Sequence, residues 1–563
     1  MKNYHSISIQ VNDDDNDNVE SSILNHAHKS NDAHNPHPQD HLVPPFSSSN
    51  NKSSNDRPAT LLVGTFNLLA TILGGGVLTL PIAFQKCGVA VTTLFMLISA
   101  YMTYMSLIML CYSSRRSGAS SFGEVVRSAY GERAEVGVNL VLFVYVSFVV
   151  VAFMILIRDI WTPLIGMLLG KSVNMHDHDG GGGVSGDRVL LGFMIFLLPF
   201  LFQRTLHALK WNCYIGFASI IILCTALVRG GFQRQYNLHF HGVHDNDDEE
   251  QFDDDATYNI EWFKVPSVKD ALFAFPIIML AFLCQFNVLS IQNTLQCPTR
   301  KRMSQLAGMS VGASMILMYL FGLGGYMMYG SDIQGNVLLN ISIDKSAYAD
   351  ESLYWLFLLG RVGCGTTLVL ALPLSFLPGR DALLEIIDVW FHNSHHQSDS
   401  AETEENICWN ALHRFNKNET PQDATITTEN EIDVIETQPL NDEHDSSSSA
   451  QKTTILIRDQ PIQQDYVFRN SVLHYGSTLL ILTYCFIGAT RVAGVATVWS
   501  LVGSSLGFCI AFILPFASFI VIEKGVTEGS DRFDTWIKLA RAMLIVSIVG
   551  AVVCTWNRLS SPV

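Results

Sequence analysis

The residues best placed to do chemistry in this chain are three consecutive glycines, Gly74 to Gly76, at the centre of the apolar run 64–84. Each glycine lowers helix stability by roughly 1 kcal/mol relative to alanine, so three together predict that the helix unwinds there. Unwound backbone leaves N–H and C=O groups without partners, and hydrocarbon tolerates this only where protein or a polar cavity satisfies them. The run therefore predicts a ligand cavity in the middle of a membrane-spanning segment.

A second polar site is predicted in the apolar run 269–293, where Pro276 removes one backbone hydrogen bond. Amide side chains follow it: Gln285, Asn287, Gln292 and Asn293. Amides in lipid are costly unless they face a cavity or a partner helix, so a substrate contact and an interhelical hydrogen bond are both open for Gln285 and Asn287. Two interrupted helices at corresponding positions of two halves are typical of inverted-repeat secondary transporters, whose half-helix N-termini hold a substrate carboxylate at the midplane.

The composition supports a chain with many membrane spans. Of its 563 residues, 48% are hydrophobic and 15% are charged, which is well below the charge content of a soluble protein. Apolar runs of about 20 residues predict an all-α membrane protein with eleven transmembrane helices. These runs lie at 62–83, 88–111, 136–159, 189–203, 211–228, 269–293, 305–328, 353–377, 471–490, 494–522 and 540–556.

The net charge of -16 lies mainly in the tails and loops. Basic residues gather in alternate short loops on the N-terminal side, which predicts a cytosolic N-terminus. Two segments rich in polar and acidic residues are expected to be disordered. The expected organisation is a disordered cytosolic tail (1–58), helices 1 to 8 (59–390) with a lumenal loop (229–268), a disordered acidic cytosolic loop (391–468), helices 9 to 11 (469–558) and a short lumenal tail (559–563).

The first and sixth spans resemble those of the amino acid/auxin permease family, in the branch shared by system A and N neutral amino acid transporters and vacuolar amino acid permeases. The family's Asn, Gly-x-Gly break and apolar turn are matched by Asn67, Gly74, Gly76, Leu78 and Leu80. The stretch AFLCQFNVLSIQNTLQCPTRKRM resembles the sixth span and its basic exit, with Gln285 where a His is common. The resemblance covers roughly 60–390 and 470–557. It implies a LeuT-like inverted repeat of five plus five helices, with the first and sixth interrupted and an eleventh appended, and ion-coupled amino acid transport.

An amino acid needs partners for both of its charged groups. Backbone N–H groups around Gly75 to Val77 suit the carboxylate, and exposed carbonyls around Phe282 to Gln285 suit the ammonium. Close helix packing is the alternative role for the glycines, and bracing of the broken helix is the alternative for Asn67. The expected substrate-binding residues are Asn67, Thr71, Gly74, Gly75, Gly76, Phe282, Gln285 and Asn287.

The coupling ion is predicted from what this chain lacks. Sodium-using relatives carry an Asn and a Thr at the positions of Ala70 and Ala371, and sodium prefers several oxygen ligands. A co-transported proton is therefore favoured over sodium, although Thr71, Thr366 and Thr367 could supply oxygens to an ion. No proton-carrying residue is identified. Arg158 and Asp159, at the outer end of the third span, are expected simply to pair at the membrane interface.

The expected function is secondary active transport of neutral amino acids by alternating access, coupled to protons or, as the alternative, to sodium. An amino acid sensor or transceptor of the same fold also remains open, with the disordered segments contacting cytosolic regulatory partners. No Walker loop, nucleophile elbow or paired carboxylates point to an enzyme, and we expect no cofactor, no metal and no nucleic acid. The resemblance favours a vacuolar or lysosomal membrane, with the plasma membrane possible.

Overall fold

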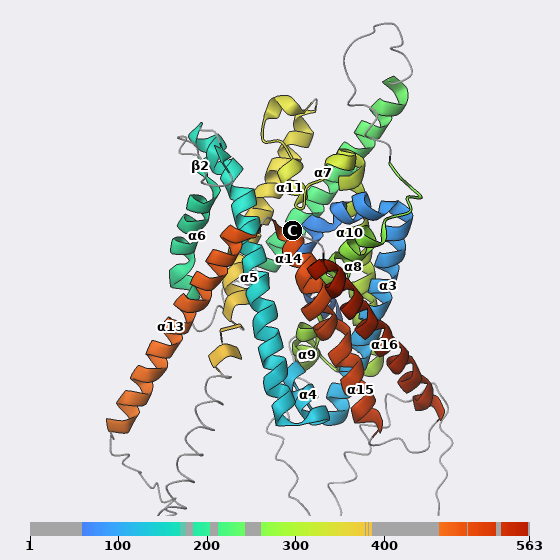
Figure 1. Cartoon of the computed structure of the whole chain (residues 1–563), viewed down its shortest axis with the longest axis vertical. Coiled ribbons are helices and arrows are strands. Elements are labelled where there is room, and N and C mark those ends of the chain that lie inside the picture. Colours follow the sequence, from blue (N-terminus) through green and yellow to red (C-terminus); the bar gives the residue numbers. More distant parts are fainter. Residues whose placement is uncertain are drawn as a thin grey trace, which may run out of the picture. The chain divides into compact units, whose positions relative to one another are not determined.

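In the computed structural model, the residues described are 59–170, 173–174, 184–202, 212–241, 260–348, 350–377, 379–380, 382–384, 461–492, 494–524 and 531–560. They are almost entirely helical (Figure 1). The α-helices are α2 (Leu61–Ile72), α3 (Leu80–Ser117), α4 (Phe122–Tyr130), α5 (Glu132–Leu169), α6 (Gly186–Leu201), α7 (Asn212–His241), α8 (Val268–Ala281), α9 (Gln285–Thr294), α10 (Arg300–Tyr329), α11 (Val337–Asn340), an unlabelled helix over 351–377, α13 (Pro461–Arg491), α14 (Val495–Val502), α15 (Leu514–Lys524) and α16 (Asp531–Ser560).

Shorter elements complete the described part. The tight 3₁₀ turns are η2 (Gly75–Thr79), η5 (Gly330–Asp332) and η6 (Lys345–Ala347), and the wide π turns are η7 (Gly503–Gly507) and η8 (Cys509–Ile513). Two short strands, β1 (Val173–Asn174) and β2 (Val184–Ser185), pair in parallel. The π turns link α14 to α15 within one continuous span.

Within the described residues, eight helical segments are long and apolar enough to cross a membrane. They are Gly75–Ser117, Glu132–Leu169, Asn212–Asn237, Val268–Thr294, Arg300–Asp332, Glu351–Leu384, Val495–Lys524 and Asp534–Ser560. The other expected spans also fall on helix, at α2, α6 and α13. The segment predicted to be the first span is divided between α2, η2 and the start of α3.

The first helix is interrupted where the glycine run predicts it. α2 ends at Ile72, Leu73 leaves the helical region with ψ 50°, and Gly74 is extended. The chain then resumes as η2 and continues into α3. The sixth helix is interrupted in the same way between α8 and α9, at Phe282 to Cys284. Both predicted interruptions are confirmed.

A sharp turn at Gly88 separates the outer part of the first span from the second span. Gly88 has φ +71° and ψ 174°, a conformation open only to glycine. Across the turn, the Thr92 hydroxyl donates to the carbonyl of Ala83 at 3.1 Å. A Cβ at position 88 would also lie 2.7 Å from Lys264 Cβ and 2.8 Å from the Glu261 carbonyl oxygen. The segment that precedes α8 therefore packs directly on this turn.

Two helices are longer than the sequence predicts. α7 continues to His241, so the first part of the expected loop 229–268 is helical. The extension is held on α10, because Arg234 donates to the Met328 carbonyl at 2.7 Å and Gln235 donates to that of Met327 at 3.3 Å. α13 likewise begins at Pro461, inside the expected loop 391–468. The expected tail 1–58 and residues 391–460 lie outside the described residues.

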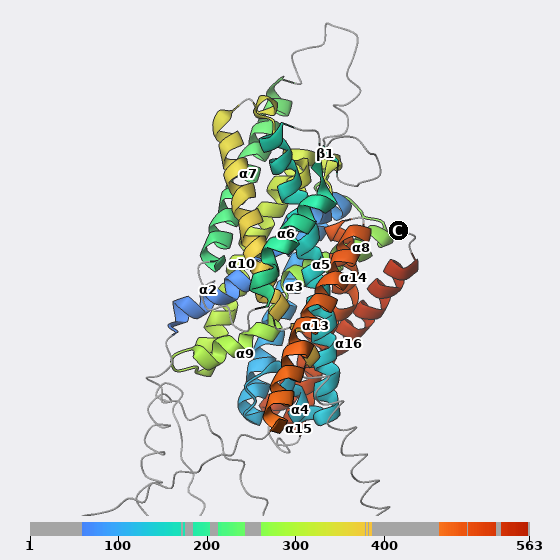
Figure 2. The ribbon, with the colours of Figure 1, turned by 90° about the vertical axis from the view of Figure 1, so that its left-hand side faces the viewer.

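The connections between the helices lie at two opposite ends of the helical unit (Figure 1). α4, which follows the second span, lies at the opposite end of the helical unit from α11 and the two strands (Figure 1). At the α4 end, α2 packs against α9 (Figure 2). Ala59 forms a β-bridge with Leu295: its N–H donates to Thr294 O at 3.2 Å, and its carbonyl accepts from Gln296 N at 2.8 Å.

Candidate functional site

The break in the first helix presents backbone donors. Gly75 and Gly76 open η2, and none of the described residues accepts a hydrogen bond from their N–H groups. The next donor in line, Val77 N, bonds to the Gly74 carbonyl at 3.2 Å. Gly74 itself is exposed, and a Cβ there would meet only the Thr71 carbonyl, at 3.9 Å. The break is therefore open at Gly74 and offers two N–H groups of the kind that bind anions.

The break in the sixth helix presents a side-chain amide. Gln285 is fully buried, and its Oε1 accepts from the backbone N–H of Cys284 at 2.9 Å. Its Nε2 has no hydrogen-bond partner among the described residues. A buried amide donor without a partner costs about 1–3 kcal/mol, so such groups are rare unless a ligand or water satisfies them.

The two breaks lie against each other. A Cβ at Gly76 would be 3.6 Å from Cα of Ala281, the last residue of α8. The Asn287 amide, on α9, donates to the Thr71 hydroxyl of α2 at 2.9 Å. That hydroxyl in turn donates to the Asn67 carbonyl at 2.9 Å. Thr71 and Asn287, which were predicted separately, are thus joined by a direct hydrogen bond between the two broken helices.

Apolar side chains from two further helices border the break. A Cβ at Gly75 would lie 2.9 Å from Leu156 and 3.3 Å from Phe153, both on α5. It would also lie 3.7 Å from Leu368 on the 351–377 helix. The first, third, sixth and eighth expected spans therefore meet here. Gly75 therefore allows close packing, which is the alternative role for the glycines. Its lack of a side chain also leaves the N–H groups of Gly75 and Gly76 accessible to a ligand.

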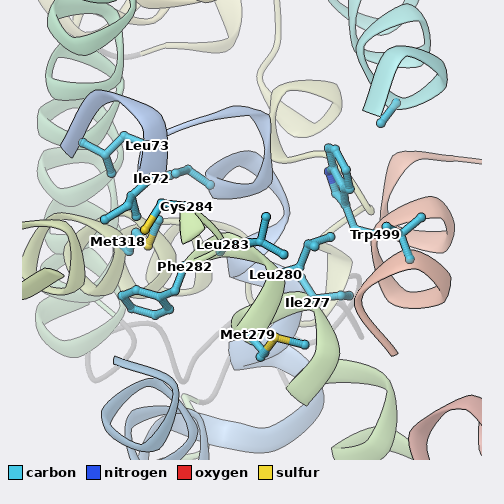
Figure 3. Close-up of a cluster of buried hydrophobic side chains, with 14 of the residues drawn as sticks. Ile72, Leu73, Ile277, Met279, Leu280, Phe282, Leu283, Cys284, Met318 and Trp499 are labelled. Carbon is cyan, nitrogen blue, oxygen red and sulfur yellow. The ribbon is translucent and has the colours of Figure 1, made fainter. Parts of the chain in front are cut away.

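The ends of the broken helices share one buried cluster of side chains. Figure 3 shows Ile72 and Leu73, from the end of α2, in the same cluster as Phe282 and Leu283 from the sixth break. Trp499 of α14 belongs to this cluster as well. Phe282 is fully buried, so in this conformation its ring is part of the packing around the site.

Asn67 differs from the other predicted site residues. Its side chain is exposed and makes no hydrogen bond to the described residues. Only its carbonyl takes part, as the acceptor for Thr71. The bracing role considered for this residue is therefore carried out by its backbone, and the helix-to-helix link comes from the side chain of Thr71.

The two candidate ion ligands on the 351–377 helix form hydrogen bonds within that helix. Thr366 and Thr367 each donate to a carbonyl of their own helix, at Val362 and Gly363, at 2.8 and 2.9 Å. Thr367 faces α7, since its Cγ2 would lie 2.7 Å from a Cβ at Gly216. Neither of these hydrogen bonds involves Thr71. In the described part of the chain, no group of three or more His, Cys, Asp or Glu side chains is arranged to hold a metal ion.

Arg158 and Asp159, which are expected to pair, are buried in the protein. They do pair, at 3.6 Å, but they are 3% and 5% exposed and lie inside the protein. Asn336 and Arg361, from segments distant in sequence, contribute to the same buried polar region and were not predicted as functional. The available signal was Arg361 itself, an arginine inside an otherwise apolar run.

The chain is similar in sequence to known proteins. The family described as transmembrane amino acid transporter protein matches residues 57–559. Vacuolar amino acid transporter 7 of Saccharomyces cerevisiae is 24% identical over 342 residues, which is 59% of this chain and 60% of that protein. Putative sodium-coupled neutral amino acid transporter 10 of Xenopus laevis is 26% identical over 327 residues, 56% of this chain and 27% of that protein.

The matched region thus spans less than two thirds of the length of these two relatives. Among solved structures, Mhp1, a nucleobase-cation-symport-1 family transporter in a closed conformation with bromovinylhydantoin bound, matches with a TM-score of 0.46 at 11% identity. That match covers 90% of this chain and 95% of the other.

Proposed function

Because this chain belongs to the family of transmembrane amino acid transporter proteins, we propose that it moves neutral amino acids across a membrane by alternating access, coupled to protons. It is an integral membrane protein, and its family is one of transporters. The observation that carries the proposal is the meeting of two broken helices, one with free N–H groups and the other with an unpartnered buried amide. Such a pair suits a small zwitterion.

Each part of an amino acid has a partner at this site. The carboxylate binds the N–H groups of Gly75 and Gly76, where the partial positive charge at the start of a helical segment adds to the hydrogen bonds. The ammonium binds backbone carbonyls freed by the break, at Phe282 and Leu283. Gln285 Nε2 donates to a polar atom of the substrate, and the apolar border formed by Phe153 and Leu156 favours an uncharged side chain.

The coupling ion is proposed to be a proton. Two supports are the alanines at positions 70 and 371, and the position of Thr367, whose side chain faces α7. A sodium-coupled mechanism has its own support in the name of the Xenopus laevis relative. The hydroxyls of Thr71 and Thr366 also keep lone pairs that a cation could use.

We further propose eleven spans in a LeuT-like inverted repeat of five plus five, with the N-terminus in the cytosol. The matched positions of the two interrupted helices support the repeat. A vacuolar or lysosomal membrane is favoured, in line with the name of the yeast relative. An acidic lumen would then drive amino acids toward the cytosol with protons.

The experiment is uptake of radiolabelled neutral amino acids by the full chain in proteoliposomes, with a proton gradient and a sodium gradient applied separately. Uptake above that of empty liposomes under the proton gradient alone is the expected result. Binding without flux under either gradient would refute transport and favour a sensor. Uptake that requires sodium and ignores the proton gradient would refute proton coupling while leaving transport intact.

A further inference from the structure

Two charged residues are buried side by side on α5, close to the proposed substrate site. Asp159 follows Leu156 by about one helical turn, which is about 5 Å along the axis. Leu156 is the residue that borders the break at Gly75. Charged side chains buried within a membrane-spanning helix are costly and usually mark an ion path or a relay. The amino acid site proposed above uses neither Asp159 nor Arg158.

Arg158 is attached mainly to neighbouring helices. Its Nη1 donates to the Ala489 carbonyl of α13 at 3.2 Å and lies 3.6 Å from the Asp187 carboxylate of α6. Its Nε lies 3.6 Å from Asp159 and makes no hydrogen bond to the described residues. The guanidinium is therefore held by a hydrogen bond to α13, while its contacts with Asp187 and Asp159 are both long ion pairs of 3.6 Å.

Asp159 contacts the segment that lies over the outer end of the site. Asn336, 1% exposed, donates to Asp159 Oδ2 at 3.5 Å, while its own Oδ1 caps α11 by accepting from Leu338 N at 3.1 Å. α11 contacts both α5 and η2. At the other end of α11, Arg361 donates to the Ile341 carbonyl at 3.0 Å. The carboxylate thus helps hold α11 against the helix that bears it.

The charges facing Asp159 are nearly balanced. From its own helix it faces Arg158, and from the 351–377 helix it faces Arg361. Asp187 offsets Arg158 from α6. Tyr329 and Tyr348 face Arg361 from either side of α11, and burial raises the pKa of Tyr348 to about 12, so that phenol stays neutral. Two cations and two carboxylates leave no net charge while Asp159 is ionised, and one added proton leaves an excess of +1.

We propose that Asp159 accepts the coupled proton and that its protonation releases α11 from α5. A neutral carboxyl is a weaker partner for Asn336 and for the nearby guanidinium groups than a carboxylate, because hydrogen bonds to charged acceptors are about twice as strong. The proton arrives on a carboxylate oxygen from the outer aqueous side. It leaves toward the substrate cavity one turn away when α11 closes again and both arginines face the carboxyl. This inference rests on the proposed proton-coupled transport.

The test compares Asp159→Asn with wild type in proteoliposomes containing the full chain. Two processes are measured: accumulation of a radiolabelled neutral amino acid driven by a pH gradient, and exchange of labelled for unlabelled amino acid without a gradient. We expect Asp159→Asn to lose gradient-driven accumulation at least tenfold. Exchange persists at a rate that no longer depends on pH. A merely structural role would lower both processes together and leave the pH profile in place.

The matched control is Asp534→Asn, since Asp534 is also paired with a cation, Lys538 of its own helix, but is 56% exposed and lies on α16, outside the charged cluster around Asp159. It should retain proton-driven accumulation. Equal loss in both variants, or accumulation by Asp159→Asn at the wild-type level, would overturn the assignment. If Asp159→Asn does not fold, Asp159→Glu is used, and an unchanged pH profile of uptake in that variant would overturn it. Wild-type protein without amino acid flux under any gradient would overturn the proposed function as well.

Discussion

The hydrogen bond between Asn287 and Thr71 can be removed with almost no change of shape by Thr71→Val. Valine keeps the branching of threonine but neither donates nor accepts, so the Asn287 amide and the Asn67 carbonyl both lose a partner. One hydrogen bond contributes about 1 kcal/mol net, and an unpaired buried amide costs about 1–3 kcal/mol. Because Asn287 is half-buried and the bond joins the two broken helices, we expect substrate affinity to fall by about 1.5 kcal/mol, or about tenfold in Kd.

The assay is equilibrium binding of a radiolabelled neutral amino acid to the purified full chain, for Thr71→Val, Asn287→Leu and the double variant. A double-mutant cycle should give a coupling energy of about 1 kcal/mol. Thr225→Val is the matched control, because the Thr225 hydroxyl bonds only to the Ile221 carbonyl of its own helix. Additive effects, with coupling below about 0.3 kcal/mol, would refute the idea that this bond holds the site together.

Four glycine substitutions distinguish positions where an added side chain would enter open space from positions where it would meet closely packed atoms. Gly74→Leu should fold normally and abolish uptake, since a Cβ there meets only open space beside the break; wild-type uptake would contradict this. Gly75→Leu should abolish flux while the protein still reaches its membrane, and normal transport would show that the break is not the binding site. Gly88→Ala should lower the midpoint of thermal unfolding, because the backbone conformation of Gly88 costs other residues about 1–3 kcal/mol. An unchanged midpoint would contradict the turn conformation described for Gly88. Gly503→Ala places a Cβ against the backbone oxygen of Pro276, so little monodisperse protein should be recovered by size-exclusion chromatography, and wild-type yield would disprove that contact.

The two helix breaks could be predicted from sequence because their cause is local. Three adjacent glycines weaken a helix wherever they occur, and amides within an apolar run need a cavity or a partner. The bond between Thr71 and Asn287 could not be predicted, because it depends on how two segments far apart in the chain are placed. The same holds for the depth of Asp159, since an apolar run does not reveal which of its faces is buried.

The length of α7 was also beyond local reasoning. Its last turns carry polar residues that end an apolar run, and the sequence therefore predicts a loop there. Those polar groups instead bond to carbonyls of α10, and Gly231 allows the two backbones to approach, since a Cβ there would lie 2.9 Å from the Gly324 oxygen. The end of α7 is set by contacts with α10, so the residues of α7 alone do not predict where the helix ends.

The attachment of α2 to α9 has a mechanical consequence. The two helices are fastened at one end by the bridge between Ala59 and Leu295, and near the break by Thr71 and Asn287. Between these points, Gly64 is packed so closely on Leu295 that a Cβ would lie 3.3 Å from it. Because the two contacts are well separated along the helices, α2 cannot rotate relative to α9 without breaking one of them. We therefore expect α2 and α9 to tilt together as one rigid body. A force applied to the chain just before Ala59 would then move the sixth span as directly as the first.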